Sequence, residues 1–318
     1  METNMADLRY GILSTSSIAP RFIAAVRHSG SGEIVALSSR SLEKAAEKAK
    51  MWEIPAFYGS HQELLQDKNV NIVYISNVNA EHYAWAKAAL EAGKHVVCEK
   101  PCTTTETQTR ELFRLAKEKK LFLMEAEKML FLPVLIETRN RILRGDLGEI
   151  TMAELSHSFP ASYNGWMFDA AAGGGPLLSS GIYAVQLILW LFGDIKRISG
   201  RASKLETGVE WQYVLTGETE SGVLFSAKNS TRAKLDNTAR IFGSRGYVEI
   251  PEYWKARKAV FCIDGETEEI AIPCDYELSY EARHIAQCFH EGLLTSPVVT
   301  EELSAAGIRA LETVKKNW

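Results

Sequence analysis

The stretch Lys94-His95-Val96-Val97-Cys98-Glu99-Lys100-Pro101 decides the fold that we expect for this chain. Its core, Val96-Val97, is apolar and β-branched and follows Gly93, which is typical of a buried parallel strand. The charged pair Glu99-Lys100 then stands at the carboxyl end of the strand, where ligands bind in open α/β sheets. Because Pro101 restricts the backbone before it, the Lys100 ammonium should project from a rigid, extended chain. A lysine in solvent is the alternative interpretation.

The composition is that of an ordinary globular protein, and the length suggests two domains. The 318 residues are 46% hydrophobic and 24% charged, and the formal net charge is −4, which provides no electrostatic footprint for nucleic acid. The longest apolar run, 181–192, is shorter than the roughly 20 residues that cross a bilayer, so we expect no membrane span. The acidic residues Glu2 and Asp7 argue against a signal peptide. The 5 scattered cysteines match no common zinc site, which predicts reduced thiols, no metal and a cytoplasmic location.

Strands alternate with helices along the first half of the chain. We expect strands at 8–13, 33–38, 72–75, 96–97 and 122–125. Two of the helices have end signals: Ser60 and Glu63 form a capping box, and Asn79 is placed to cap the helix 80–92. This alternation predicts a parallel, doubly wound sheet of the α/β Rossmann type over residues 1–127.

The turn after the first strand is the place where such a sheet holds a dinucleotide pyrophosphate. Gly11 lies in the strand, and 14–19, with the sequence STSSIA, turns into a helix. The G-x-G-x-x-G fingerprint fails, because Ser14 and Ser16 stand where glycines are usual. A serine hydroxyl can cap a helix or bind a phosphate, and these residues taken alone favour a helix-capping turn.

The end of the second strand bears on the choice between NAD and NADP. An NAD site places an acid near this point, to bind the ribose 2′-hydroxyl, but 36–41 contains none. Arg40 stands there instead and could bind a 2′-phosphate with two hydrogen bonds. A solvated arginine beside a helix start is the alternative. We favour NADP(H), with NAD(H) possible.

Several of these motifs together resemble the Gfo/Idh/MocA (glucose–fructose oxidoreductase/inositol dehydrogenase) family. The resemblance runs from about Leu8 to the C-terminus and rests on Gly11 to Ala19, Ser39-Arg40-Ser41, Asn79-x-x-His82, the block 89–96 and Glu99-Lys100-Pro101. The residues 123–126 and 131–133, with the sequences LMEA and FLP, are similar to the branch that contains dihydrodiol dehydrogenase. The resemblance implies a cofactor site that consists of Gly11, Ser14, Thr15, Ser16, Ile18, Ser39, Arg40, Asn77, Asn79, His82, Glu99 and Lys100.

The pattern changes beyond Gly148 to long alternating strands. We expect strands at 150–159, 198–205, 208–216, 222–230, 237–242 and 247–250, and helices at 133–144, 280–292 and 301–316. This predicts an α+β domain over 128–318, built on a large, mainly antiparallel open sheet, that binds the substrate. The change in composition places the domain boundary near Glu127. An open sheet face needs a cover, and the resemblance implies a homodimer or homotetramer through that face.

A glycine-rich turn, Gly173-Gly174-Gly175-Pro176, opens the apolar helix of this second half. The segment is similar to the family pattern G-G-G-x-L-x-D-x-G-x-[HY], which places a proton-relaying residue at Tyr183. Ser179 stands where the family pattern has an acid. Just before the glycines, Phe159, Tyr163, Trp166 and Phe168 form an aromatic group, of which Trp166 and Phe168, with Ser179, are candidate substrate contacts.

The resemblance implies an NAD(P)-dependent oxidoreductase that acts on CH–OH groups of a sugar-like or cyclic diol substrate. The proton of the alcohol would pass to Tyr183, whose pKa the Lys100 ammonium would lower. A non-catalytic dinucleotide sensor on the same fold is the alternative, and the absent acid at Ser179 supports it. An enzyme that acts on a tetrapyrrole or an imine would share the fold.

Overall fold

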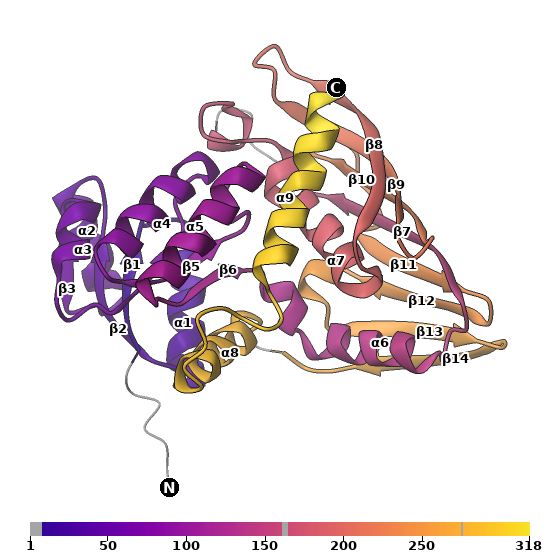
Figure 1. Ribbon diagram of the computed structural model, residues 1–318, viewed down its shortest axis with the longest axis horizontal. Helices are drawn as coiled ribbons and strands as arrows, with labels where there is room; N and C mark the ends of the chain where they lie inside the picture. Colours follow the sequence, from indigo (N-terminus) through magenta and orange to yellow (C-terminus); the bar gives the residue numbers. More distant parts are fainter. Residues whose placement is uncertain (1–7, 161–164, 275) are drawn as a thin grey trace, which may run out of the picture. The chain divides into compact units, whose positions relative to one another are not determined.

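The computed structural model describes residues 8–160, 165–274 and 276–318, which form two compact units, each with its own sheet (Figure 1). The first unit contains the residues up to 103 together with 107–128 and 276–301. The second contains 104–106, 129–275 and 302–318.

The sheet of the first unit is parallel over the described residues, with the strand order β3-β2-β1-β4-β5-β6. Its strands are β1 (Arg9–Leu13), β2 (Glu33–Ser38), β3 (Ala56–Tyr58), β4 (Ile72–Ile75), β5 (His95–Glu99) and β6 (Leu123–Ala126). The strand order reverses between β1 and β4, which makes the carboxyl ends of these strands a topological switch point. The predicted Rossmann-type sheet is confirmed.

Helices cover both faces of this sheet. The helical segments are α1 (Ala19–Ser29), α2 (Leu42–Met51), α3 (His61–Gln66), η1 (Asn79–Glu81), α4 (His82–Glu91), α5 (Glu106–Lys119) and α8 (Leu278–His290). One face packs its apolar side chains with those of α3, α4 and α5, such as Leu64, Leu90 and Leu112. On the other face, Phe22 of α1 stacks on Tyr74 of β4, with ring centroids 3.8 Å apart.

The helix ends agree only partly with the sequence. Ser60 caps α3, because its hydroxyl accepts a hydrogen bond from the Glu63 N–H at 3.2 Å. The helix after Asn79 begins later than predicted: Asn79 is the first residue of the short turn η1, and α4 begins at His82. The role of Asn79 as a helix cap stays a prediction. β3 was not expected from the sequence, because three partly exposed residues show no hydrophobic alternation.

The helix α8 joins the first unit, although its sequence lies far beyond the predicted boundary at Glu127. It packs against α1, and Tyr276 just before it stacks on His28, with ring centroids 4.4 Å apart. Glu277 pairs with Arg21 and accepts a hydrogen bond from Lys128 Nζ at 2.6 Å. Long-range packing of this kind leaves no signal in the local pattern.

The sheet of the second unit has the order β14-β13-β12-β11-β7-β10-β9-β8 over the described residues. β7 and β10 pair in parallel, and the other neighbours are antiparallel, as the prediction of a mainly antiparallel sheet requires. The strands are β7 (Ile150–Ser158), β8 (Ile195–Lys204), β9 (Glu210–Thr219), β10 (Leu224–Ser230), β11 (Thr238–Gly243), β12 (Gly246–Pro251), β13 (Lys258–Ile263) and β14 (Glu266–Ala271). β13 and β14 were not expected; β14, with the sequence ETEEIA, is too acidic to show a strand pattern.

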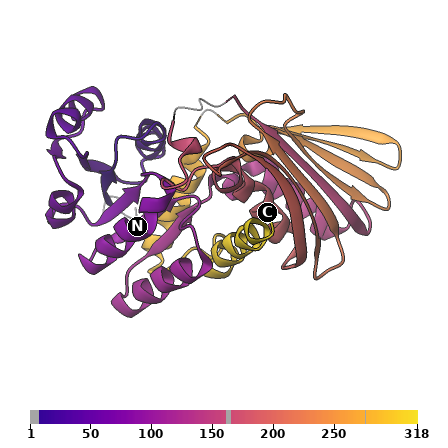
Figure 2. The ribbon, with the colours of Figure 1, turned by 90° about the horizontal axis from the view of Figure 1, so that it is seen from above.

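Three helices lie on one side of this sheet: α6 (Pro133–Arg144), α7 (Ile182–Phe192) and α9 (Glu301–Lys316) (Figure 2). α7 is buried at every residue from Ile182 to Leu189, as expected of a core helix. No helix in the described ranges has both the length and the apolar character that a bilayer crossing requires.

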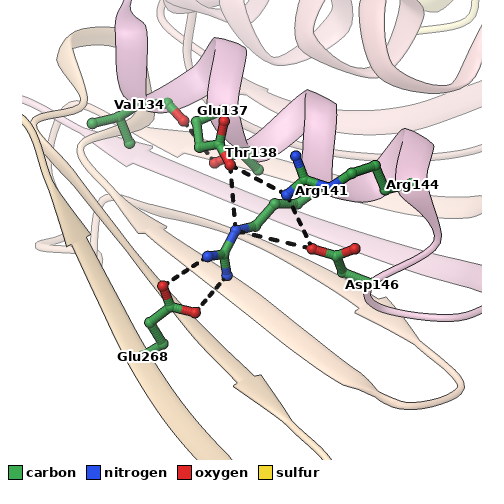
Figure 3. A network of polar contacts seen from close by, with 7 residues as sticks. All are labelled: Val134, Glu137, Thr138, Arg141, Arg144, Asp146 and Glu268. Atoms are coloured by element: carbon green, nitrogen blue, oxygen red, sulfur yellow. Dashed lines mark hydrogen bonds and ion pairs between the residues drawn. The ribbon is translucent and has the colours of Figure 1, made fainter.

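An ion-pair network fastens α6 over the β13–β14 edge (Figure 3). Both Arg141 Nη atoms donate to the Glu268 carboxylate at 2.7 Å, and the guanidinium lies 4.5 Å from the ring centroid of Phe261. Arg144 pairs with Glu137 and Asp146, at 3.3 Å each. The two parallel N–H donors of the Arg141 guanidinium match the two oxygens of a carboxylate, so this contact fixes the angle of α6 on the edge strands.

Candidate functional site

The turn between β1 and α1 leaves the first backbone N–H groups of α1 without a side-chain cap. The N-cap residue is Ile18, and no side chain caps the helix, so the interpretation as a helix-capping turn is wrong. Ser16 instead donates from its hydroxyl to the Ser76 hydroxyl at 2.8 Å, which ties the turn to the end of β4. The N–H groups of Ala19 and Arg21 donate to backbone carbonyls of the turn, so the attraction for an anion rests on the helix dipole and on the lack of an acidic residue in the first turn.

Ser14, in the same turn, has a φ angle of 113°, in a region that favours glycine. Such strain at a non-glycine residue is typical of functional sites, where the surrounding structure imposes the conformation. Gly11 has a different reason: a Cβ there would approach Leu64 Cδ2 to 2.8 Å and Val70 Cγ1 to 2.9 Å. Close packing of α3 on β1 therefore explains Gly11, and its assignment to the cofactor stays a prediction.

The end of β2 carries the residues that were expected to meet a ribose. Ser39 is buried, and Ser41 caps α2 by accepting from the Lys44 N–H at 3.3 Å. Arg40 lies between them and is exposed. The structure therefore presents a guanidinium at this strand end, and no carboxylate occurs in 38–41.

His61, which follows the capping residue Ser60, also lies at this edge of the sheet and was not predicted as a site residue. Its Nδ1 lies 2.8 Å from the Ser38 hydroxyl, and its Nε2 lies 3.3 Å from Asn77 Nδ2. Burial lowers the pKa of His61 to about 4, with a further lowering by Arg40 and an opposing effect of Glu81. The ring is therefore neutral at pH 7 and bridges the ends of β2 and β4.

The loop after β4 holds Asn77, Asn79 and His82 close to the end of β5. The His82 ring lies between two backbone carbonyl oxygens, 2.8 Å from that of Pro101 and 3.0 Å from that of Asn77. Burial lowers the pKa of His82, so a neutral ring donates to one of these carbonyls at a time. Asn77 Oδ1 is buried and accepts no hydrogen bond from the residues that the structure describes, which leaves an acceptor at the strand end.

Lys100 follows β5 directly and lies among carboxylates. Tyr74 donates to Glu99 Oε1 at 2.5 Å, and the Cys102 N–H donates to Glu125 Oε1 at 2.8 Å. Burial lowers the pKa of Lys100, while Glu99 and Glu127 oppose that effect. The peptide bond between Lys100 and Pro101 is cis. The arrangement holds the half-buried Lys100 side chain at the carboxyl end of β5.

In the second unit, the glycine-rich turn leads through a π-helical turn, η4 (Leu177–Gly181), into α7. Gly175, with a φ angle of 110°, donates its N–H to the Met167 carbonyl at 2.6 Å. Tyr183 is the second residue of α7, and both Tyr183 and Ser179 are buried. Lys100 belongs to the first unit and Tyr183 to the second, so their pairing stays a prediction.

The aromatic residues before the glycine-rich turn differ in their burial. Trp166 and Phe168 lie in the short helical turn η3 (Trp166–Phe168), where Phe168 is buried and Trp166 is exposed. Phe159 follows β7 and lies 5.3 Å from His157, between ring centroids. Tyr163 lies outside the described residues.

Comparisons with known proteins agree with this architecture. Residues 8–127 match the model of an oxidoreductase family with an NAD-binding Rossmann fold, and 135–249 match the GFO/IDH/MocA C-terminal domain. The trans-1,2-dihydrobenzene-1,2-diol dehydrogenase of Mus musculus is 34% identical, over 97% of this chain and 96% of its own. The Homo sapiens enzyme of the same name is 33% identical over the same shares.

Solved structures show the same fold. A 3-ketoreductase from Actinomadura kijaniata, in complex with NADP and TDP-benzene, has a TM-score of 0.89 and 23% identity, over 98% of this chain and 97% of its own. The aldose-aldose oxidoreductase from Caulobacter crescentus has the same TM-score, identity and coverage. The predicted family and fold are thus confirmed, and the chain belongs to the GFO/IDH/MocA family of NAD(P)-dependent oxidoreductases.

Proposed function

We propose that this oxidoreductase binds NADP(H) in preference to NAD(H) at the carboxyl ends of β1, β2 and β4. The uncapped N-terminus of α1 and the turn with Ser14, Thr15 and Ser16 fit a pyrophosphate. Ser39 and the exposed Arg40 fit a ribose 2′-phosphate, and no acid competes with that phosphate there. The 3-ketoreductase solved with NADP is consistent with this choice, and a levoglucosan dehydrogenase of the same fold was solved with NADH.

The remaining polar groups of this edge fit the other parts of the cofactor. The unmatched carbonyl oxygen of Asn77 can accept a hydrogen bond from a ribose hydroxyl or a carboxamide. Asn79 and Glu99 lie at the ends of β4 and β5, and His82 fixes the loop that joins these two strand ends. Ile18, the N-cap residue of α1, contributes backbone to the turn.

We propose further that the substrate is a cyclic diol or a sugar-like alcohol, which is oxidised reversibly. The relatives that are about a third identical are named for a cyclic diol, and two structural neighbours are named as a 3-ketoreductase and an aldose-aldose oxidoreductase. Bound NADP⁺ would accept a hydride from the substrate carbon. Tyr183 would take the hydroxyl proton, and Lys100 would hold the substrate oxygen and lower the tyrosine pKa. Trp166, Phe168 and Ser179 are the proposed substrate contacts.

The observation that carries this proposal is the environment of Lys100. A lysine at the end of a buried central strand, with its pKa lowered by burial and carboxylates around it, is not a solvated surface residue. Groups with such perturbed protonation cluster at sites of proton chemistry.

The decisive experiment compares Tyr183→Phe and Lys100→Met with the wild type. NADPH and NADH affinities are measured by fluorescence titration, and turnover is followed with trans-dihydrobenzenediol and a panel of aldoses. General acid–base catalysis contributes about 10²–10⁴-fold, so kcat should fall by that factor in both variants. NADPH affinity should stay close to that of the wild type in Tyr183→Phe. Tyr276→Phe is the control, because it removes an exposed hydroxyl and keeps the ring that stacks on His28.

The absence of an acid at Ser179 favours a second candidate, a dinucleotide sensor without catalysis. Tight NADPH binding without turnover of any substrate in the panel would support the sensor and refute the enzyme. Ser179→Asp restores the acid of the family pattern. If that acid supports the proton relay, the variant should keep or raise kcat and shift the pH optimum.

The open face of the second sheet supports a homodimer or homotetramer. Cross-strand register places Leu224, Met152, Phe242 and Tyr247 in one row across β10, β7, β11 and β12. Leu224 and Met152 are 50% and 42% exposed, which is unusual for apolar side chains in the middle of a sheet.

We propose that 1–127 binds the cofactor and that 128–318 binds substrate and a second copy. The cysteines of the described residues form no disulfide, which supports our proposal of a cytoplasmic location.

A further inference from the structure

The turn that precedes Tyr183 is wider than an α-helix, and side chains from two neighbouring strands hold it. η4 is a π-helical turn of 5 residues, Leu177–Gly181, directly before α7. Such turns are rare, and they occur frequently at functional sites. The first N–H groups of a helical segment have no acceptor within the segment, so they need partners from elsewhere in the fold.

β9 supplies the first partner, Glu210. Its side chain is buried, with 2% exposed, and Oε1 accepts a hydrogen bond from the Leu177 N–H at 2.9 Å. The fit around this carboxylate is close, since a Cβ on Gly175 would approach Oε1 to 2.2 Å. Only glycine fits at position 175, because any side chain would clash with the Glu210 carboxylate. A carboxylate at the start of a helix also interacts favourably with the helix dipole.

β10 supplies the second partner, Asn229, which is also buried. Its Nδ2 donates to the Ser180 hydroxyl at 2.7 Å, and that hydroxyl donates to the Pro176 carbonyl at 3.0 Å. On the same side, a Cβ on Gly181 would approach the Tyr213 hydroxyl to 2.8 Å. The two ends of η4 are thus held by the sheet, at Leu177 and at Ser180.

We propose that Glu210 and Asn229 are positioning residues that set the direction of the Tyr183 hydroxyl by holding η4. Tyr183 lies two residues beyond the end of η4, on a helix that is buried on all sides. A helix is stiff, so a change in the turn rotates or shifts the whole first turn of α7. A misplacement of about 1 Å of a reacting group can cost about 10²-fold in rate. This inference rests on the proposed role of Tyr183 in proton transfer.

The test uses Glu210→Ala, Glu210→Gln and Ser180→Ala in the full-length protein. Glu210→Ala removes the acceptor of the Leu177 N–H, and kcat should fall about 10–100-fold. Glu210→Gln keeps an acceptor oxygen at the same place, so it should retain kcat within a few fold. Ser180→Ala removes the acceptor of Asn229 with little change in volume, and it serves if Glu210→Ala does not fold. NADPH affinity should change less than twofold in all three variants, because these residues lie outside the unit that binds the cofactor.

Glu218→Ala is the matched control on the same strand, since Glu218 pairs only with Lys196 and Arg197 at the surface among the contacts of the described chain. It should leave kcat unchanged. Loss of kcat in Glu210→Gln equal to that in Glu210→Ala would overturn the hydrogen-bond argument.

A double variant separates this proposal from the proposed function. If Glu210 acts through Tyr183, Glu210→Ala should have little further effect in the Tyr183→Phe background. An equal loss in both backgrounds would refute the positioning role while leaving the function intact. Near-wild-type turnover in Tyr183→Phe alone would refute the proposed proton relay, and this inference with it.

Discussion

Glu281 of α8 provides a sharp test of the electrostatics of the first unit. Its side chain is 0% exposed, and neither carboxyl oxygen has a hydrogen-bond partner among the described residues. Burial raises the pKa of Glu281 well above its ordinary value of 4.5, and nearby carboxylates raise it further. The charged groups that face it are Glu99, Glu125 and Glu127, which raise this pKa, and Lys128, which lowers it. Tyr10, whose pKa Glu281 raises, is buried beside it.

The perturbation is Glu281→Gln, which resembles the protonated acid in shape and cannot ionise. In the wild type, the folded protein keeps a proton on Glu281 that the unfolded chain releases above pH 4.5. Stability is therefore lost as the pH rises from that value toward the raised pKa, at about 1.4 kcal/mol per pH unit. The variant should lack this loss.

The assay is urea denaturation at several pH values between 5 and 8, followed by circular dichroism and tryptophan fluorescence. The difference in unfolding free energy between Glu281→Gln and the wild type should grow with pH, in favour of the variant. Glu266→Gln, an exposed glutamate of β14, is the control and should run parallel to the wild type. Parallel curves for Glu281→Gln and the wild type would mean that Glu281 is ionised in the folded protein, and would refute the reasoning.

Three further predictions concern the phosphate site, the turn after β1 and the open face of the second sheet. We expect NADPH to bind about tenfold or more tightly than NADH, because a charge-assisted pair contributes about 1.5–3 kcal/mol. Arg40→Asp should abolish this preference. An unchanged ratio of the two dissociation constants would exclude Arg40 from the phosphate site. Ser14→Gly should stabilise the protein by about 1–3 kcal/mol in thermal denaturation, because it relieves a φ angle of 113°, whereas Ser17→Gly should not. The double variant Met152→Lys/Leu224→Lys should be monomeric in light scattering at micromolar concentration, whereas the wild type should form the proposed oligomer. A monomeric wild type would contradict the proposed interface.

Much of the first unit follows from local sequence, because its strands are short, apolar and bounded by turn residues. The strands Glu33–Ser38 and Ile72–Ile75 agree residue by residue with the pattern. In the second unit, the helix Pro133–Arg144 likewise begins at its proline and ends before its glycine. Burial on both faces leaves only apolar side chains in a parallel strand, so composition alone identifies it. The same logic fails for two strands at sheet edges. Ala56–Tyr58 is only three residues long and partly exposed, and Glu266–Ala271 is rich in glutamate.

The site shows the same division. The positions of Lys100 at a strand end and of Tyr183 early in a helix were readable from neighbouring residues, because strand ends and glycine turns are local features. The contacts between distant parts of the chain could not be predicted from the sequence. His61 reaches Asn77, Glu210 reaches Leu177, and Glu281 approaches Tyr10, each across a separation that only the packing of distant elements closes. Hydrogen bonds and desolvation act through space, so protonation and orientation in this protein depend on its tertiary structure, whereas the secondary structure that carries the groups depends on the sequence nearby.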